Sequence, residues 1–301
     1  MSKFRRVSFV LPNVPRSAIP LAPAYLDVPT PPTPPTAIGP VPRTQGVLSL
    51  STKAVGAGSG IDKFRTSGAM KALFPRGHGV QAIMINTSGG LTGGDQLDIE
   101  ASAGTGSHLT LTTQAAERAY RSKEGHARMD SHLSVAAGGS LHWLPQELIL
   151  FEGARLNRSL TVDLAQDAKF LMVEPMIFGR TAMGEVLNDV DFKDKIRVTC
   201  DGAPLYFDGM HLTGDVAAQL TDRAVAHRAG AMVSLLYVAP DAEAHLAPLR
   251  ALLPQTGGAS LLAPDVLALR MVASDSHTLR SPLLPILDRL SGDGLPTSWR
   301  L

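Results

Sequence analysis

Short apolar or alternating segments recur along the chain from Gly46 onward, and glycine, proline, asparagine or aspartate residues separate them. In the segment 108–113, Leu109 and Leu111 fall on one face and the threonines on the other, the period-two pattern of a half-buried strand. The segment 80–86 is more uniformly apolar, as a strand covered on both faces would be. The strands that this pattern predicts are 47–55, 80–86, 96–101, 108–113, 127–135, 141–144, 148–151, 156–164, 168–173, 195–200, 204–207, 231–238 and 266–272.

Helical periodicity is confined to the last part of the chain. The segment 241–253 starts with an aspartate that can cap a helix and places apolar residues near one face, although Pro248 lies inside it. The segment 276–290 starts with a serine that can cap, and we expect Pro282 and Pro285 to break it into short turns. Since the strands do not alternate with helices, the pattern predicts a mainly β fold with a small α-helical C-terminal part.

Proline dominates the beginning of the chain. Eleven of the 22 prolines lie between residues 12 and 42, where the run at 29–35 can neither pair in a sheet nor continue a helix. We therefore expect residues 1–42 to form a proline-rich, flexible N-terminal extension, and residues 43–301 to form one β-rich domain.

Composition narrows the functional classes. The 28 basic and 27 acidic side chains leave a net charge of +1, which predicts no nucleic-acid partner and no anionic membrane surface as a partner. No apolar run reaches the roughly 18 residues that a membrane span needs, and the N-terminal residues do not read as a signal peptide. With a single cysteine, Cys200, no internal disulfide can form. We expect a cytoplasmic protein.

The usual catalytic and binding motifs are missing from the sequence. There is no G-x-S-x-G elbow, and the nine histidines form no zinc-binding cluster. The segment 86–95 reads Asn-Thr-Ser-Gly-Gly-Leu-Thr-Gly-Gly-Asp, but it lacks the Lys-Ser/Thr pair that ends a phosphate-binding loop. We expect a tight turn between the strands 80–86 and 96–101 that also presents Asp95.

Two carboxylates stand in unusually apolar surroundings. Glu147 follows Trp-Leu-Pro-Gln and precedes Leu-Ile-Leu-Phe, and Glu174 ends the apolar run 170–173. A buried carboxylate needs a partner, so one reading is a structural pairing, for example with Arg155 or Arg180. The other readings are a polar, partly buried path and a general acid–base pair.

Several short strings, in order, resemble the family of urease accessory proteins called UreD, or UreH in some bacteria. The resemblance covers residues 43–301. It rests on the string at 86–95, Thr-Thr-Gln-Ala-Ala-Glu-Arg-Ala-Tyr-Arg at 112–121, Trp-Leu-Pro-Gln-Glu at 143–147, Phe-Glu-Gly-Ala-Arg at 151–155, Glu-Pro-Met-Ile-Phe-Gly-Arg at 174–180, Gly-Glu at 184–185, Leu-Phe-Pro at 73–75 and Leu-Pro-Thr-Ser-Trp-Arg at 295–300.

The resemblance implies both a fold and a role. The fold would be a multi-sheet, helical, solenoid-like β domain with two helices. The protein would not be an enzyme and would hold no tightly bound cofactor. It would bind apo-urease subunits and the accessory protein UreF, and with the GTPase UreG it would form the complex through which nickel reaches the urease active site.

A conduit for nickel should not hold the ion tightly, so spaced carboxylates suit it better than clustered histidines or thiolates. We expect Asp95, Glu147, Glu174 and Glu185 to face such a conduit, with Arg180 paired to one of them. The segment 276–301 either packs onto UreF or covers a face of a sheet.

Two rival functions come from other classes. One is a carbohydrate-active β-solenoid enzyme that uses Glu147 and Glu174 as acid and base. The other is a small-ligand-binding β protein that uses the Gly-rich loop 89–94. Neither rival accounts for the ordered set of strings.

Overall fold

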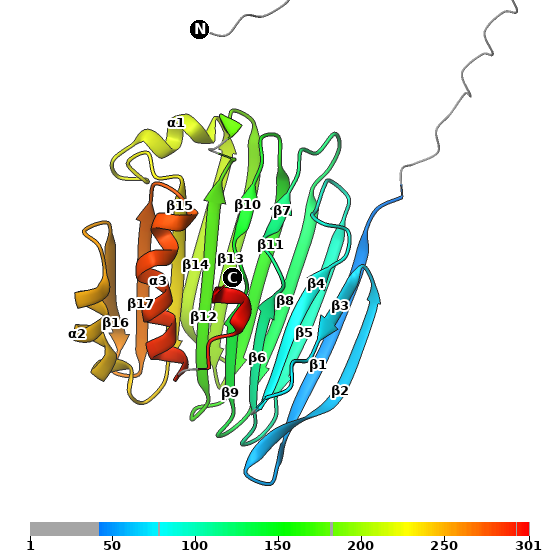
Figure 1. Cartoon of the computed structure of the whole chain (residues 1–301), viewed down its shortest axis with the longest axis vertical. Helices are drawn as coiled ribbons and strands as arrows, with labels where there is room; N and C mark the ends of the chain where they lie inside the picture. The colour runs from blue at the N-terminus through cyan, green and yellow to red at the C-terminus, as the bar shows by residue number, and fades with distance from the viewer. Residues whose placement is uncertain (1–41, 78, 181–182, 293, 301) are drawn as a thin grey trace, which may run out of the picture. The chain divides into compact units, whose positions relative to one another are not determined.

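A computed structural model describes residues 42–301 apart from residues 78, 181, 182, 293 and 301 (Figure 1). Residues 1–41 of the expected N-terminal extension 1–42 lie outside the described residues. The rest of the chain folds into two packed β-sheets with helices along one of them (Figure 1).

The seven-stranded sheet has the order β14-β13-β11-β8-β5-β1-β2. Its strands are β1 (Gln45–Val55), β2 (Gly58–Gly68), β5 (Gln96–Ala103), β8 (Ala127–Val135), β11 (Arg155–Leu164), β13 (Val190–Cys200) and β14 (Ala203–Gly214). β1, β5, β8, β11 and β13 pair in parallel, whereas β2 and β14 pair antiparallel at the two edges.

The ten-stranded sheet has the order β16-β17-β15-β12-β9-β6-β4-β3; in addition, β10 pairs with β12, and β7 pairs with β10. Its strands are β3 (Met70–Leu73), β4 (Val80–Asn86), β6 (His108–Thr113), β7 (Glu117–Ala119), β9 (Ser140–Leu144), β10 (Leu148–Leu150), β12 (Lys169–Phe178), β15 (Ala231–Val238), β16 (Gly257–Ala263) and β17 (Val266–Ala273). β4, β6, β9 and β12 pair in parallel.

The chain winds helically between the two sheets. From β4 to β13 it enters the seven-stranded and the ten-stranded sheet in turn, so that parallel neighbours within one sheet are separated by a strand of the other. Parallel strands elsewhere usually need a crossover helix; here the opposite sheet supplies the return. The mainly β, solenoid-like, multi-sheet fold is therefore confirmed.

Two hydrophobic cores explain why β12 is apolar throughout. Met172 and Met176 face the core between the sheets, whereas Leu171, Val173 and Ile177 face the core beneath the helices. A strand covered on both faces cannot alternate between apolar and polar residues. Its one ionisable residue beyond Lys169 is Glu174, which is buried and alternates with Val173, so its side chain lies on the inter-sheet face.

The predicted helices are present as α2 (Ala242–Leu252) and α3 (Ser276–Ser291). The expectation that Pro282 and Pro285 break the second segment is wrong, because α3 runs through both. Its buried face, which includes Leu279, Leu283 and Leu287, holds it on the ten-stranded sheet.

The helix caps differ from the sequence expectation. The α3 cap is Asp275, which accepts a hydrogen bond from the Thr278 amide at 2.8 Å. Asp241 stands at the N-cap of α2, but its carboxylate accepts from the Tyr237 hydroxyl instead of capping. An aspartate at an N-cap position therefore need not bond to the helix amides when a closer donor is present.

Further elements were not predicted from the sequence: β2, β3, β7, β16 and α1 (Val216–Thr221). β2 is a polar edge strand and β7 has three residues, so neither carries a periodic apolar signal. The Gly-rich segment is also placed differently. β4 and β5 belong to different sheets, so the segment crosses between sheets and does not form a turn between paired strands.

The end of the chain covers a sheet face. Trp299, in a short 3₁₀ helix (Thr297–Arg300), is fully buried and donates its indole N–H to the Leu144 carbonyl at 3.0 Å. Together with α3 it covers the helix-side face of the ten-stranded sheet, the second of the two expected roles for 276–301. No helix in the described part of the chain has both the length and the apolarity of a membrane span.

Candidate functional site

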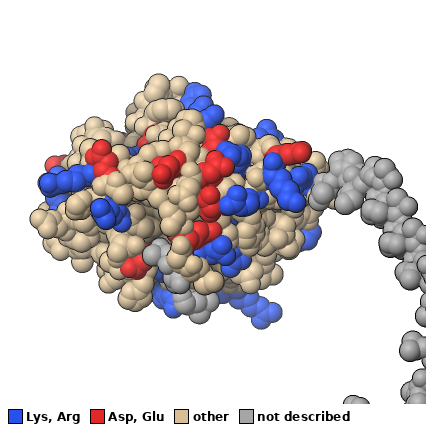
Figure 2. All heavy atoms as spheres, turned by 90° about the horizontal axis from the view of Figure 1, so that it is seen from above, with Lys and Arg blue, Asp and Glu red and all other residues tan. Residues whose placement is uncertain are grey.

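Five of the strings that carry the family resemblance meet at one end of the molecule: 86–95, 112–121, 151–155, 174–180 and 184–185. Parallel strands end at a common edge, so the segments that follow β4, β7, β10 and β12 stack there. Backbone hydrogen bonds join them in sequence: Leu91 to Arg118, Phe151 to Ala119, and Gly179 to Leu150. Viewed from this end, acidic side chains run across the middle of the surface with basic side chains beside them (Figure 2).

The Gly-rich segment is packed against its neighbour. A Cβ at Gly90 would stand 2.2 Å from the Tyr120 ring, and one at Gly93 would stand 2.1 Å from the Glu124 carbonyl. These glycines therefore permit close approach of two loops, which gives no support to a ligand cradle at 89–94.

Asp95 holds this segment in place. Its carboxylate accepts hydrogen bonds from the amide of Thr44 at 2.7 Å and from the amide of Thr92 at 2.8 Å. The side chain is only 5% exposed. Asp95 therefore joins the start of the domain to the Gly-rich segment and is not presented to solvent.

Glu174 belongs to a buried ionic network that joins the two sheets. Its carboxylate accepts from the Trp143 indole at 2.6 Å and from the Arg158 guanidinium at 2.5 Å. Arg158 lies on β11 of the opposite sheet and also pairs with Asp194 of β13 at 2.6 Å. All three charged side chains are at most 10% exposed.

One guanidinium thus faces two carboxylates away from water. Burial raises the pKa of Glu174, and the attraction of Arg158 offsets this only in part. Burial opposes the charge on Arg158, but Asp194 and Glu174 together outweigh it and raise the pKa of Arg158. Arg158 is therefore a charged tie between the sheets. The expected partners Arg155 and Arg180 lie elsewhere.

Glu147 lies on the other face of the ten-stranded sheet. Its carboxylate accepts from Arg280 at 2.8 Å and from the Ser276 hydroxyl at 3.1 Å, and both residues are on α3. Arg280 also stacks over the Trp299 ring and donates to the Trp299 carbonyl. Glu147 therefore anchors the C-terminal part of the chain.

The structure does not bring Glu147 and Glu174 together. Glu174 lies between the sheets, whereas Glu147 faces α3, and each is engaged by a different arginine. A glycosidase needs two carboxylates that flank one scissile bond and lie about 5–10 Å apart. This arrangement gives no support to the carbohydrate-active rival.

Glu185 lies at the loop end and pairs with Arg180. Such a pairing of Arg180 with one of the four candidate carboxylates is expected from the sequence. The carboxylate receives both the guanidinium, at 2.9 and 3.0 Å, and the Arg180 amide. These hydrogen bonds, first the one from the Arg180 side chain, lower the pKa of Glu185. Arg180 also stacks over the Phe151 ring at 4.4 Å.

Around this pair is an open depression with a volume of about 640 Å³. Tyr120 and Phe151 meet edge to face in it, and Met183 and Val186 are exposed there. Glu185 thus lies at a surface rich in aromatic, methionine and arginine side chains, the composition that protein interfaces favour.

Within the described residues, no group of three or more histidine, cysteine, aspartate or glutamate side chains is placed to hold a metal ion. Asp191 accepts from both His126 and His211, at 2.9 and 3.1 Å, but this is a hydrogen-bonded arrangement on the outer sheet face. The four carboxylates expected to line a conduit are spread over the loop end, the inter-sheet core and the face under α3.

Sequence reasoning missed Arg158, Asp194 and Arg280. Arg158 and Asp194 stand in ordinary alternating strands, and their burial depends on the pairing of distant strands. A weak signal did exist: the inward-facing positions of β11 and β13 are otherwise apolar, so a charge in that register points to an internal pair.

Fold and site together define a class of protein: a helically wound, two-sheet β protein whose loops stack at one end and whose buried carboxylates are engaged by arginines and backbone amides. The family model described as UreD urease accessory protein matches residues 44–298.

Full-length relatives agree with this match. The chain is 50% identical to the urease accessory protein UreD of Roseobacter denitrificans over 86% of this chain and 96% of the relative. It is 46% identical to UreD of Ruegeria pomeroyi over 84% of this chain and all of the relative, and 42% identical to UreD of Sinorhizobium medicae over 86% and 96%. The chain belongs to the UreD family of urease accessory proteins.

Proposed function

We propose that the protein is a non-enzymatic cytoplasmic scaffold that binds apo-urease and UreF and, together with UreG, supports the delivery of nickel to the urease active site. The observation that carries the proposal is the family match, which spans nearly the whole described domain. The stacked loops at one end support it further, because they bring five of the family strings together at an exposed surface.

Asp95, Glu147, Glu174 and Glu185 are our candidates for the nickel path. All four supply oxygen ligands, which bind divalent ions weakly enough to release them. Each is already engaged, so an ion in transit has to compete with an arginine or with backbone amides. That competition favours brief contacts over storage.

Co-purification tests the scaffold role. The tagged full chain is co-expressed with the urease subunits and UreF, and the captured proteins are identified by mass spectrometry. We expect both partners to be recovered together. Recovery of the folded chain alone would contradict the proposal, and screens of glycans and small ligands would then test the rival functions.

Isosteric variants test the nickel path. Glu147→Gln, Glu174→Gln and Glu185→Gln each keep the shape of the side chain and remove its charge. Glu100→Gln, on the exposed face of β5, is the matched control. We expect the first three to form the complex and to lower the nickel content of urease, and the control to leave it unchanged. Full nickel loading by all three would exclude these residues from the path.

A further inference from the structure

A half-buried carboxylate at the loop end has no ion-pair partner among the described residues. Glu117, on β7, accepts hydrogen bonds from the Asn86 side-chain amide at 3.1 and 3.3 Å and from the Arg118 backbone amide at 3.0 Å. Among the described residues, no nitrogen of a basic side chain lies within 4.0 Å of the Glu117 carboxylate oxygens, the distance limit for an ion pair. Glu147, Glu174 and Glu185, by contrast, each pair with an arginine.

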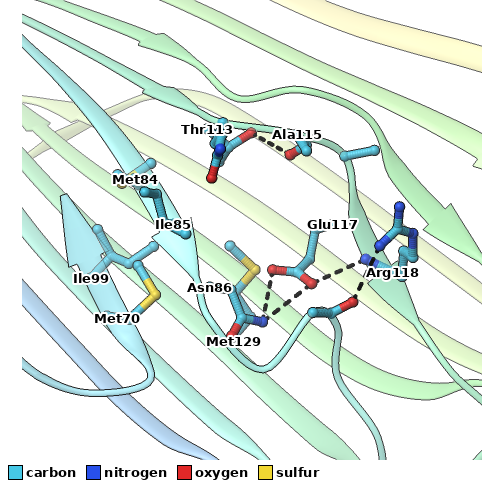
Figure 3. Close-up of a pocket in the computed structure, with 13 residues that line it drawn as sticks. Met70, Met84, Ile85, Asn86, Ile99, Thr113, Ala115, Glu117, Arg118 and Met129 are labelled. Atoms are coloured by element: carbon cyan, nitrogen blue, oxygen red, sulfur yellow. Dashed lines mark hydrogen bonds between the residues drawn. The ribbon is translucent and has the colours of Figure 1, made fainter. Parts of the chain in front are cut away.

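This carboxylate lies at a cavity of about 100 Å³ at the loop end of the inter-sheet space (Figure 3). Such a volume holds roughly three water molecules or a slim aliphatic chain. Gly89, Gln114 and Ala115, which are exposed, line its outer part, so the cavity is reached from the surface.

The walls are apolar and adaptable. Met70, Met84 and Met129 come from three strands of the two sheets and line the cavity together with Ile99 (Figure 3). Methionine side chains rearrange easily around an inserted aliphatic group. A chain that is apolar along its length and positively charged at its tip would match both the walls and the carboxylate.

We propose that this cavity receives a lysine side chain from a partner polypeptide, with the ammonium group on Glu117 and the aliphatic stem between the methionines. Three of the acceptor positions of the carboxylate are already used by Asn86 and the Arg118 amide. An ammonium group, which can donate a single hydrogen bond as a point charge, suits what remains better than the planar fork of arginine.

The electrostatics of the site agree. Burial raises the pKa of Glu117, and the hydrogen bond from Asn86 is the largest of the effects that oppose it. A cation beside the carboxylate acts in the same sense as that bond and favours the ionised form. The proposal deepens the proposed function, since the lysine belongs to a protein of the same assembly.

A small probe tests the cavity directly. In the full chain labelled with ¹³C at the methionine methyl groups, n-butylammonium chloride is titrated and the spectrum is followed by NMR. We expect saturable shifts of Met70, Met84 and Met129, with the other methionine signals unmoved. Glu117→Gln should weaken the response at least tenfold, and neutral butan-1-ol should not reproduce it. No shift, or equal shifts with butan-1-ol or in Glu117→Gln, would overturn the proposal.

The assembled complex tests the source of the lysine. Capture of the urease subunits and UreF is compared for the wild-type chain, Glu117→Gln and the exposed control Glu100→Gln. We expect at least tenfold weaker capture of one partner by Glu117→Gln alone. Carbodiimide coupling should join Glu117 to a lysine of that partner in the wild-type complex.

The two proposals fail in different ways. If the wild-type chain captures no partner, the proposed function fails and the NMR titration still decides whether the cavity binds an alkylammonium group. If wild type and Glu117→Gln capture both partners equally and no coupling is found, the lysine proposal fails while the proposed function stands.

Discussion

Arg158 and Arg180 make similar contacts in opposite settings. Arg158 joins Glu174 and Asp194 between the sheets, where it is 10% exposed, whereas Arg180 holds Glu185 at the loop end and is 48% exposed. A buried charge that loses its partner cannot recover its solvation, but an exposed one is simply hydrated. The inner network should therefore govern stability, and variants at the loop end should report on function without unfolding the domain.

The largest effect is expected at Arg158. Arg158→Met leaves two carboxylates facing each other between the sheets, and we expect a loss of about 3–5 kcal/mol in the free energy of unfolding. Urea denaturation followed by circular dichroism measures it. The control is Arg128→Met, which removes an arginine paired with Asp98 and Asp130 on the exposed sheet face. If Arg158→Met lost no more free energy of unfolding than the control, this would contradict the role of Arg158 in holding the two sheets together.

Arg280→Met comes next. The substitution leaves Glu147 without its arginine partner under α3 and removes the hydrogen bond to the Trp299 carbonyl. We expect the free energy of unfolding to fall by about 2–3 kcal/mol. Relative to the wild type, amide hydrogen exchange should become faster in α3 but not in β11. Uniform exchange changes across both elements would show that Arg280 does not anchor the C-terminal part specifically.

Glu174→Gln should be much milder than Arg158→Met. The glutamine carbonyl can still accept from Trp143, and Arg158 keeps Asp194 as a single partner, so we expect a change of about 1 kcal/mol or less. Thermal unfolding of the two variants side by side checks the difference. If Glu174→Gln proved as damaging as Arg158→Met, the second carboxylate would be essential to the network.

His142 offers a test by pH. Burial is the larger cause, and the neighbouring His108 the smaller, of a pKa of His142 lowered to about 3. In the unfolded chain the His142 imidazole takes up a proton near its ordinary pKa of 6.5, whereas in the folded chain it stays neutral down to about pH 3. The contribution of neutral His142 to the free energy of unfolding is therefore complete above pH 6.5 and is lost as the pH falls toward 3. The free energy of unfolding should therefore decline less steeply with falling pH in His142→Phe than in the wild type, by up to about 1.4 kcal/mol per pH unit below 6.5. Parallel declines in both proteins would show that His142 does not contribute.

The smallest effect on stability is expected at Arg180. Arg180→Met should leave the unfolding midpoint unchanged, because water replaces its contacts at the loop end. The same variant should weaken capture of a partner if the depression with Phe151 and Met183 is an interface. Unchanged capture would remove this depression from the docking surface.

The sequence predicted most of the fold because the strands alternate or are uniformly apolar, and each pattern reports how many faces are covered. The winding between two sheets followed only from the family resemblance, since local periodicity does not reveal which strands pair. α3 ran through Pro282 and Pro285 because burial of its leucines outweighs the lost hydrogen bonds. β2 escaped detection because an exposed edge strand has no apolar face.

The site was predicted less completely for a similar reason. Glu147 and Glu174 stood out because charges interrupt apolar runs, and the need for partners was foreseen. Their partners, Arg280 and Arg158, were not foreseen, because the pairs form across sheets or between a strand and a distant helix. Glu117 gave no signal, because it interrupts no long apolar run: two alanines precede it and Arg118 follows it. Its partial burial arises from the stacking of loops.

Urease activation tests the central claim most directly. Apo-urease, UreF, UreG and nickel are co-expressed with and without this chain, and ureolytic activity and bound nickel are measured on the purified urease. The account predicts active, nickel-loaded urease only when the chain is present. When Arg180→Met replaces the wild-type chain, urease activity should fall in proportion to the loss of partner capture by this variant. Equal activity and nickel content without the chain would contradict it.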